Sequence, residues 1–276
     1  MDNVTLGVLD TLQKTAIQQG NQNKKKKQHE YYFDKFKMFF GEDYFVKNIR
    51  ISQPTIGDIL KIGEKNFYGA LAPFINNSTS IRLMLWKGGI DWCNVSDIEV
   101  YQILINILTD TTPLKLIFPD IDFSQFRIRE IFNSKEGEKK LCLYNPTLDL
   151  ILYEEDYMEI AEYIREMLNI HPKVEKAKGK IAKQWMIQED EQNLLNKTSD
   201  SNYSLLSMVS FLINHPGFKY DLESLKKVGI CMFYDAVKRL QLYEMTRALL
   251  QGSYSGFCDT SKIDKEQFNF TRNIEN

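Results

Sequence analysis

The sequence predicts an α+β protein that is predominantly helical, with a small antiparallel sheet in an N-terminal domain and an all-helical C-terminal module. Its 14 glycines and 7 prolines are few for 276 residues, because average usage of these two residues is about 12%, and this scarcity favours long helices. Apolar residues recur with helical spacing along most of the chain. Short β-branched and aromatic runs separated by turn residues cluster within residues 114–153, which predicts the sheet there.

Changes in composition along the chain mark four parts. The first part is polar and holds too little apolar surface to offset the entropy lost on folding. Dense aromatic residues begin at Tyr31 and open a hydrophobic core, and a highly charged stretch begins after His171 and Pro172. We therefore expect a mobile basic arm at residues 1–29, a mixed α+β domain at 30–172, a charged connecting helix at 173–200 and a helical C-terminal module at 201–276.

The first half of the mixed domain is expected to be mainly helical. Ser96 and Glu99 have the spacing of a capping box, in which the two side chains satisfy free backbone N–H groups at a helix start. Pro73 and residues 76–78 are expected to interrupt the chain. The predicted elements are an extended segment at 44–51, a helix from Pro54 to Gly63 or Tyr68, a helical run at 80–86 closed by Gly88 and Gly89, and a central core helix from 97 to 108.

The second half of this domain is expected to contain the sheet and one amphipathic helix. The predicted strands are residues 114–118, 126–132, 140–144 and 148–153, which we expect to pair mostly as antiparallel hairpins. Acidic residues at 154–156 suit a helix N-terminus. The apolar face of this helix is predicted to consist of Tyr157, Ile160, Ala161, Ile164, Met167 and Leu168.

The charged stretch from Lys173 to Asn196 has only a narrow apolar stripe, formed by Val174, Ala177, Ile181 and Trp185. Such a stripe predicts a helix that protrudes from the molecule or bridges two parts of it. The C-terminal module is predicted to contain a buried helix at 205–213, a short helix capped by Asp221 and ended by Gly229, and a longer helix that reaches Leu250 before Gly252.

Charge and composition exclude several classes of function. The net charge of −2 lacks the excess positive charge that drives non-specific nucleic-acid binding. The N-terminus lacks the basic and apolar regions of a signal peptide, and no run of about 20 apolar residues is present to span a bilayer. The four cysteines are widely spaced and the three histidines do not cluster with them, so we expect reduced thiols, no metal and no cofactor.

One pattern formally matches an enzyme. Pro119 and Asp120, followed by Glu138, Lys139 and Lys140, have the order of the P-D…E-x-K signature of metal-dependent nucleases. In that signature the carboxylates hold a divalent cation and the lysine polarises the attacking water. Because Glu138 follows Gly137 in an expected hairpin turn, we favour a solvated charge cluster over a catalytic site.

Two further motifs are disfavoured by the residues at their key positions. Residues 221–241 could form a DNA-reading helix-turn-helix, but Asp235 occupies the inward position of the second helix and acidic neighbours oppose a phosphate backbone. Residues 252–256 resemble a nucleophile elbow, but Tyr254 stands where the serine is needed and a helix precedes the segment. We therefore expect a glycine-flanked aromatic turn there and no catalytic residue.

Three blocks of sequence together resemble tail-morphogenesis proteins of tailed bacteriophages and prophages, a group that includes tail-assembly-chaperone-like and minor tail proteins. The resemblance covers roughly residues 40–272 and carries no catalytic signature. The blocks are residues 49–59 (IRISQPTIGDI) with Gly63 and Glu64, residues 88–92 (GGIDW), and residues 229–241 (GICMFYDAVKRLQ) continuing to residues 252–263 (GSYSGFCDTSKI).

This resemblance implies a non-enzymatic role in phage tail assembly, either by transient binding to a helical tape-measure protein or by a permanent place in the tail. It places the protein in the host bacterial cytoplasm or in the virion tail, with other tail proteins as partners, and it allows a homo-oligomer. The alternative is a phage-encoded magnesium nuclease or DNA-binding protein. The candidate partner-binding residues are Tyr243, Leu249, Leu250, Tyr254 and Phe257, unless they close the protein's own core, and the candidate nucleic-acid arm is Lys24, Lys25, Lys26 and Lys27.

Overall fold

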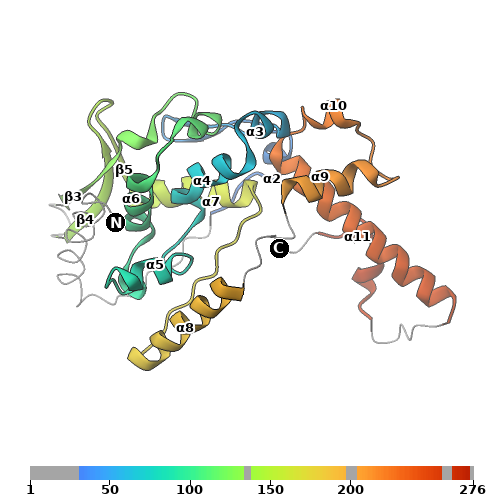
Figure 1. The fold of residues 1–276 in the computed structure, drawn as a ribbon. Coiled ribbons are helices and arrows are strands. Elements are labelled where there is room, and N and C mark those ends of the chain that lie inside the picture. The colour runs from blue at the N-terminus through green and yellow to red at the C-terminus, as the bar shows by residue number, and fades with distance from the viewer. Residues whose placement is uncertain (1–30, 134–137, 197–203, 257–262, 274–276) are drawn as a thin grey trace.

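The computed structural model describes residues 31–133, 138–196, 204–256 and 263–273. Helices dominate the described residues, and the strands form two small antiparallel sheets, so the predicted fold class is confirmed (Figure 1). The predicted basic arm, residues 1–29, lies outside the described residues.

The described part of the chain begins with a short helix and a hairpin. Asp34 caps α2 (Lys35–Phe39) by accepting hydrogen bonds from two backbone N–H groups. The extended segment predicted at 44–51 is a hairpin of β1 (Tyr44–Val46) and β2 (Ile49–Ile51), in which Val46 pairs with Ile49. Lys47 in its turn has a φ of 52°, which the tight reversal requires. Residues Val46, Ile49 and Ile51 are buried, so one side of the hairpin faces the core.

Two helices replace the single one predicted after Pro54. Thr55 and Asp58 form a capping box at the start of α3 (Ile56–Ile62), and Gly63, with a φ of 91°, separates it from α4 (Glu64–Ile75). The predicted break at Pro73 is wrong, because Pro73 lies inside the last turn of α4. The missing N–H of a proline costs one helical hydrogen bond there, and the ring is buried.

The remaining helices of this region agree with prediction. α5 (Arg82–Lys87) ends at Gly88 and Gly89, and α6 (Asp97–Ile107) begins at the predicted capping box, where the Glu99 carboxylate accepts from the Ser96 N–H at 2.8 Å. α6 is buried from Ile98 to Ile105, as expected of a central helix. α7 (Glu154–Met167) buries the whole predicted apolar face.

The larger sheet has three strands in the order β3-β4-β5: β3 (Arg127–Asn133), β4 (Glu138–Asn145) and β5 (Leu150–Tyr153). In its register Leu143 pairs with Leu152, and both side chains are buried. The predicted first strand at 114–118 is wrong, because residues 112–116 form a 3₁₀ helix, η2 (Thr112–Leu116). Pro113 favours this helical turn, and short apolar runs do not distinguish a buried turn from a buried strand.

Helices α4, α6 and α7 enclose the centre of the main core (Figure 1). The ring of Phe74 lies 5.6 Å from that of Tyr101, 5.1 Å from Phe118 and 5.2 Å from Phe123. The Tyr101 hydroxyl donates to the Phe123 carbonyl at 2.6 Å, so its burial leaves no unpaired hydroxyl. Packed aromatic rings therefore form a continuous cluster at the centre of the molecule.

A buried arginine ties these three helices together. Arg165 of α7 donates through Nε to the Phe74 carbonyl at 3.0 Å and through Nη2 to the Asn76 carbonyl at 2.8 Å. Its guanidinium also pairs with Asp97 at 3.0 Å and with Glu162 at 2.7 Å. Burial raises the pKa of Asp97, although Arg165 lies beside it. The arginine satisfies carbonyls at the C-terminal end of α4 that the helix itself leaves unpaired.

The core crosses the predicted boundary between the mixed domain and the C-terminal module. α11 (Ile230–Tyr254) begins in contact with the start of α3: the Ile230 N–H donates to the Pro54 carbonyl and the Ile56 N–H to the Val228 carbonyl, both at 3.0 Å. Ile230, Phe233 and Val237 belong to the same buried cluster as the residues of α4, α6 and α7. The first half of α11 is therefore part of the main body.

The two other predicted C-terminal helices are present. α9 (Leu205–Asn214) buries only Leu205 and Leu212, and Leu206 is 74% exposed, so it is less buried than expected. Asp221 caps α10 (Leu222–Leu225) as predicted. The charged connecting helix begins later than predicted: residues 173–179 have no regular structure and α8 spans Lys180–Asn196.

Replacing Arg165 with methionine is expected to lower the free energy of unfolding by about 3–5 kcal/mol, because it leaves Asp97 buried without a counter-ion. Urea denaturation followed by circular dichroism measures the change. The control is Lys61→Met, which removes an exposed pair with Asp58 and should cost less than about 1 kcal/mol. Equal stabilities of the two variants would contradict the role given to Arg165.

Gly57→Ala tests the contact between α3 and the segment before α11. A Cβ at this position would lie 2.8 Å from the Lys226 carbonyl oxygen, so we expect a loss of roughly 1–3 kcal/mol. Gly69→Ala is the matched control, since nothing lies within 4 Å of its Cβ position, and alanine in a helix should gain about 0.5–1 kcal/mol. The urea midpoints of the two variants should move in opposite directions.

Candidate partner-binding surface

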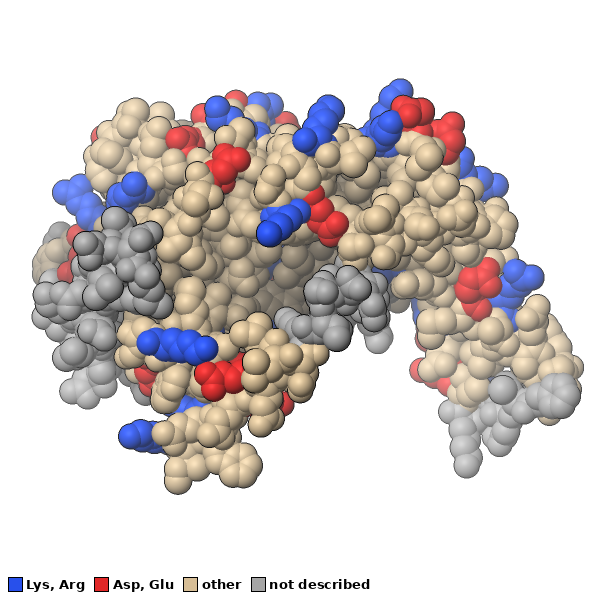
Figure 2. All heavy atoms as spheres, in the orientation of Figure 1, with Lys and Arg blue, Asp and Glu red and all other residues tan. Residues whose placement is uncertain are grey.

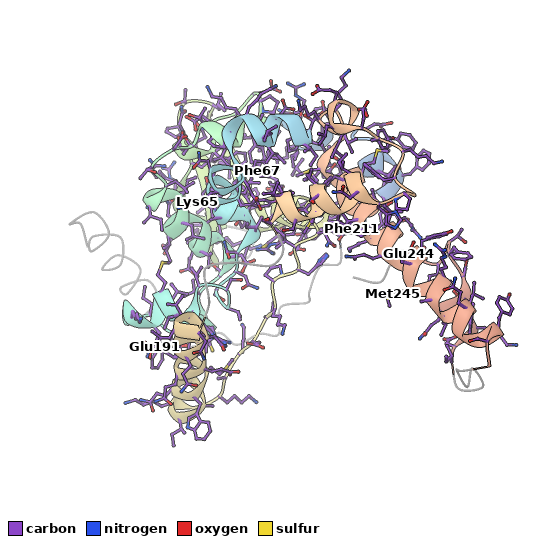
Figure 3. The ribbon with its side chains drawn as sticks, turned by 45° about the vertical axis from the view of Figure 1, so that its right-hand side comes forward. Lys65, Phe67, Glu191, Phe211, Glu244 and Met245 are labelled. Carbon is purple, nitrogen blue, oxygen red and sulfur yellow. The ribbon has the colours of Figure 1, made fainter. Side chains whose placement is uncertain are left out.

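The distal half of α11 projects from the main body of the molecule (Figure 1). It carries large apolar side chains in contact with solvent: Met245 is 67% exposed, Tyr254 85% and Tyr243 44%. Figure 3 places Glu244 and Met245 on this part of α11, beyond Phe211 of α9. A continuous helix presents these side chains on a rigid backbone, with Met245 on one side and Tyr243 and Tyr254 on the other.

A C-terminal segment covers one side of this projection. The Thr246 hydroxyl donates to the Gln267 carbonyl of η5 (Lys265–Phe268) at 3.3 Å, and the Phe270 ring lies 5.3 Å from the ring of Tyr243. Arg239 donates to the Arg272 carbonyl at 2.8 Å. Thr246 is consequently buried, and part of the apolar surface of α11 is used within the chain itself.

The predicted partner-binding residues divide into three groups. Tyr243 and Tyr254 are exposed, while Leu249 and Leu250 are half-buried. Phe257 lies outside the described residues. The structure brings Tyr243, Leu250 and Tyr254 to one face of α11, because they are spaced by seven and four residues.

The predicted glycine-flanked turn at 252–256 is wrong in its first half. α11 continues through Gly252 and Ser253 to Tyr254, and Gly256, with a φ of 73°, lies just after the helix end. Glycine inside a helix is tolerated when neighbouring residues continue the hydrogen-bond pattern. The helix therefore carries Tyr254 further from the body than a turn would.

The residues predicted as a nucleic-acid arm, Lys24, Lys25, Lys26 and Lys27, lie outside the described residues. The helix-turn-helix hypothesis finds no support in the described residues. Ile230 and Phe233, which begin the second helix, are fully buried in the main core, as the preferred interpretation of plain helix packing expects.

The residues of the nuclease pattern lie partly in other structural elements than the sequence predicted. Glu138 and Lys140 lie in strand β4, whereas the sequence predicted a turn at Glu138. Asp120, however, accepts two hydrogen bonds from the guanidinium of Arg50, at 2.8 and 2.9 Å. Both carboxylate oxygens of Asp120 are thus engaged by an internal ion pair, the arrangement of a structural contact and not of an open metal ligand.

In the part of the chain that the structure describes, the buried thiols and the metal-ligating side chains give no further candidate site. Burial raises the pKa of the Cys231 thiol to about 11 and also raises that of Cys142, which disfavours the reactive thiolate. Within the described residues, histidine, cysteine, aspartate and glutamate do not form a group of three that could hold a metal ion.

Sequence analysis predicted a protruding helix at 173–196 but did not assign a site to it. α8 projects from the same side of the molecule as the distal half of α11, and Figure 2 shows open space between the two projections. Figure 3 shows Glu191 of α8 and Met245 of α11 far apart, with Phe211 of α9 between them. The molecule therefore offers two separate rigid elements to a partner.

Ion pairs fasten α8 to α5. Arg82 donates to the Asp190 carboxylate at 2.5 and 2.6 Å and to Glu175 at 2.5 Å, and its side chain is nearly buried. Lys183 pairs with Asp91. The irregular segment before α8 is held as well, because the Trp92 indole donates to the Glu175 carbonyl at 3.1 Å.

A small second core lies beneath these ion pairs. Ile187 of α8 packs there with Leu85, Trp92 and other residues of the α5 region. The apolar stripe predicted from the sequence faces the other way: Val174, Ile181 and Trp185 are exposed, and Ala177 alone of the four is packed against this core. α8 is therefore attached mainly through Ile187 and the ion pairs of Lys183 and Asp190, contacts that hydrophobic periodicity does not reveal.

Comparisons with protein-family models, with curated proteins and with solved structures find no match to this chain. Among the described residues, none of the helices has the length and apolar character needed to cross a bilayer.

A chain that ends at Gly256 should loosen the projection of α11. Removing residues 257–276 takes away the hydrogen-bond partner of Thr246 and the Phe270 ring that packs against Tyr243, so we expect amide hydrogen exchange at 239–250 to accelerate by roughly tenfold. Exchange in α7 should stay unchanged and serves as the internal control. Unaltered protection at 239–250 would show that η5 does not support α11.

Proposed function

We propose that this protein acts without chemistry, through contacts with other proteins during the assembly of a bacteriophage tail. The observation that carries the contact-based role is the projecting half of α11, with Met245 and Tyr254 largely in solvent. The assignment to tail assembly rests on the sequence resemblance described above. The expected partners are other tail proteins, including a tape-measure protein, and the protein acts in the host bacterial cytoplasm or in the finished tail.

The geometry of α11 supports such a role in physical terms. Apolar side chains on a rigid helix lose little conformational entropy when a partner covers them, so more of the hydrophobic gain becomes affinity. Aromatic residues are enriched among the residues that dominate protein interfaces. Leu250 and Tyr254 share one face of the helix and Met245 lies on the other, so a partner that wraps around the projecting end would bury all three side chains.

Genetic complementation tests this proposal. Deleting the gene from its phage or prophage should give heads without functional tails, and the wild-type gene should restore them. Tyr254→Asp combined with Met245→Asp should lower the yield of tailed particles at least about tenfold, because a charge at an apolar interface costs more than 1.4 kcal/mol. Electron microscopy and infectious titre measure the yield.

Phe132→Asp provides the matched control, since Phe132 is also an exposed aromatic residue but lies on β3. Its yield should equal that of the wild type. Normal tails in the absence of the gene would refute the proposal. Magnesium-dependent cleavage of DNA by the purified protein, abolished by Asp120→Ala, would replace it with the nuclease alternative.

A further inference from the structure

The outer surface of the α8 projection combines lysines with apolar side chains. We call it the α8 face and define it by its exposed residues Lys176, Lys178, Lys180, Ile181, Trp185 and Leu195. Figure 2 shows lysine or arginine side chains on this projection. Trp185 is 70% exposed, although tryptophan side chains are on average highly buried and their burial is strongly favourable.

The apolar residues of the α8 face have the spacing of a helix–helix seam. Four residues separate Ile181 from Trp185, and ten separate Trp185 from Leu195. Gln188 and Gln192 occupy the two seam positions between Trp185 and Leu195. Intervals of four and three residues in alternation place side chains along one stripe, as in a coiled coil. The stripe lies opposite Lys183 and Asp190, which form ion pairs with Asp91 and Arg82, so α8 uses one side within the chain and leaves the other side without a partner in the described residues.

The exposed charge of this region is positive on balance, because Lys176, Lys178 and Lys180 outnumber the exposed Glu189 and the other acids of the region are in ion pairs. Glu175 and Asp190 both pair with Arg82, and Glu191 pairs with Lys87 at 3.4 Å. Lys176, Lys178 and Lys180 are exposed at the N-terminal end of the stripe. The complementary surface is therefore one that carries carboxylates beside apolar side chains.

The ion pairs of Arg82 hold the α8 face in place before any partner arrives. The guanidinium joins α5, α8 and the segment that precedes α8, and it is largely shielded from solvent. Such preorganisation reduces the entropy lost on binding. A surface that is apolar, exposed and rigid has the properties of an interface rather than of a loop that adapts to water.

The composition of the stripe favours a protein over nucleic acid or lipid. Ile181 and Leu195 offer neither charge nor a stacking surface to a nucleic acid, and the single exposed Trp185 does not form the row of aromatic platforms on which successive bases stack. A bilayer would desolvate Gln188 and Gln192 without supplying hydrogen-bond partners. A polypeptide helix can pair with both amides and cover the apolar side chains.

We propose that the α8 face binds an acidic amphipathic helix of another protein. The apolar seam of that helix packs on Ile181, Trp185 and Leu195, and its carboxylates lie beside Lys176, Lys178 and Lys180. This surface is separate from the α11 projection, and the proposal does not depend on a role in tail assembly.

The test uses the full-length protein and fluorescein-labelled helical peptides of about 20 residues, long enough to cover α8. One peptide has leucine at the seam positions and glutamate beside them. The second has leucine and lysine, and the third has serine and glutamate. Fluorescence anisotropy should show binding of the first peptide alone, with an affinity that falls as salt is added.

Two variants test the two components of the α8 face. Trp185→Ala and the triple change K176E/K178E/K180E should each weaken binding at least about tenfold, as loss of an interface anchor does. Trp185→Phe should retain most of the affinity. The matched controls are Tyr32→Ala, an aromatic residue that is 96% exposed elsewhere, and K61E/K226E/K227E near α3 and α10, which should bind as the wild type does.

Circular dichroism of each variant confirms that it is folded before binding is compared. Equal affinity of the wild type and both α8 variants would overturn the proposal, as would the absence of binding by the leucine–glutamate peptide. A preference for oligothymidylate or for phosphatidylglycerol vesicles, lost in the same variants, would assign the α8 face to nucleic acid or to membrane and would also overturn it. Failure of tail complementation would leave this assay unaffected.

Discussion

The buried guanidinium of Arg165 fixes the end of α4, and the position of the α8 projection depends on that end. Its hydrogen bonds to the carbonyls of Phe74 and Asn76 set the direction in which the chain leaves the helix. The next residues hold the segment before α8: Asn77 donates to the Lys173 carbonyl at 3.0 Å, and Arg82 binds Glu175 and Asp190. Two arginines in succession thus connect the central core to the projection.

The α11 projection depends on a different long-range contact. Backbone hydrogen bonds between residues 54–57 and 226–230 attach the start of α11 to the main body, and Gly57 permits the close approach of the two segments. Because α11 is one continuous helix, anchoring its first half also fixes its exposed second half. Both projections are therefore extensions of the core, and their apolar side chains are presented at little entropic cost.

Local signals in the sequence predicted most of the fold. The capping box at Ser96, the glycines after α5, the acidic start of α7 and the Asp221 cap each act on neighbouring residues, so no tertiary information was needed to find them. The run at 114–118 was wrongly predicted as a strand, because a short apolar run fits both a buried strand and a buried helical turn. Only the tertiary surroundings distinguish the two. Of the candidate site, Tyr243 and Tyr254 were identified and found exposed, whereas the α8 face was missed.

The sequence by itself determined the predominantly helical class, the places where most helices begin and end, and the near-neutral charge, since these follow from local propensity and composition. The tertiary structure alone decided which side of α8 meets solvent. Hydrophobic periodicity marked Ile181 and Trp185 as an apolar stripe. Arg82, which precedes Asp190 by about a hundred residues in the chain, binds Asp190 and so holds the side of α8 that carries Ile187 against α5. An ion pair between distant residues sets that rotation, and no short stretch of sequence contains both partners.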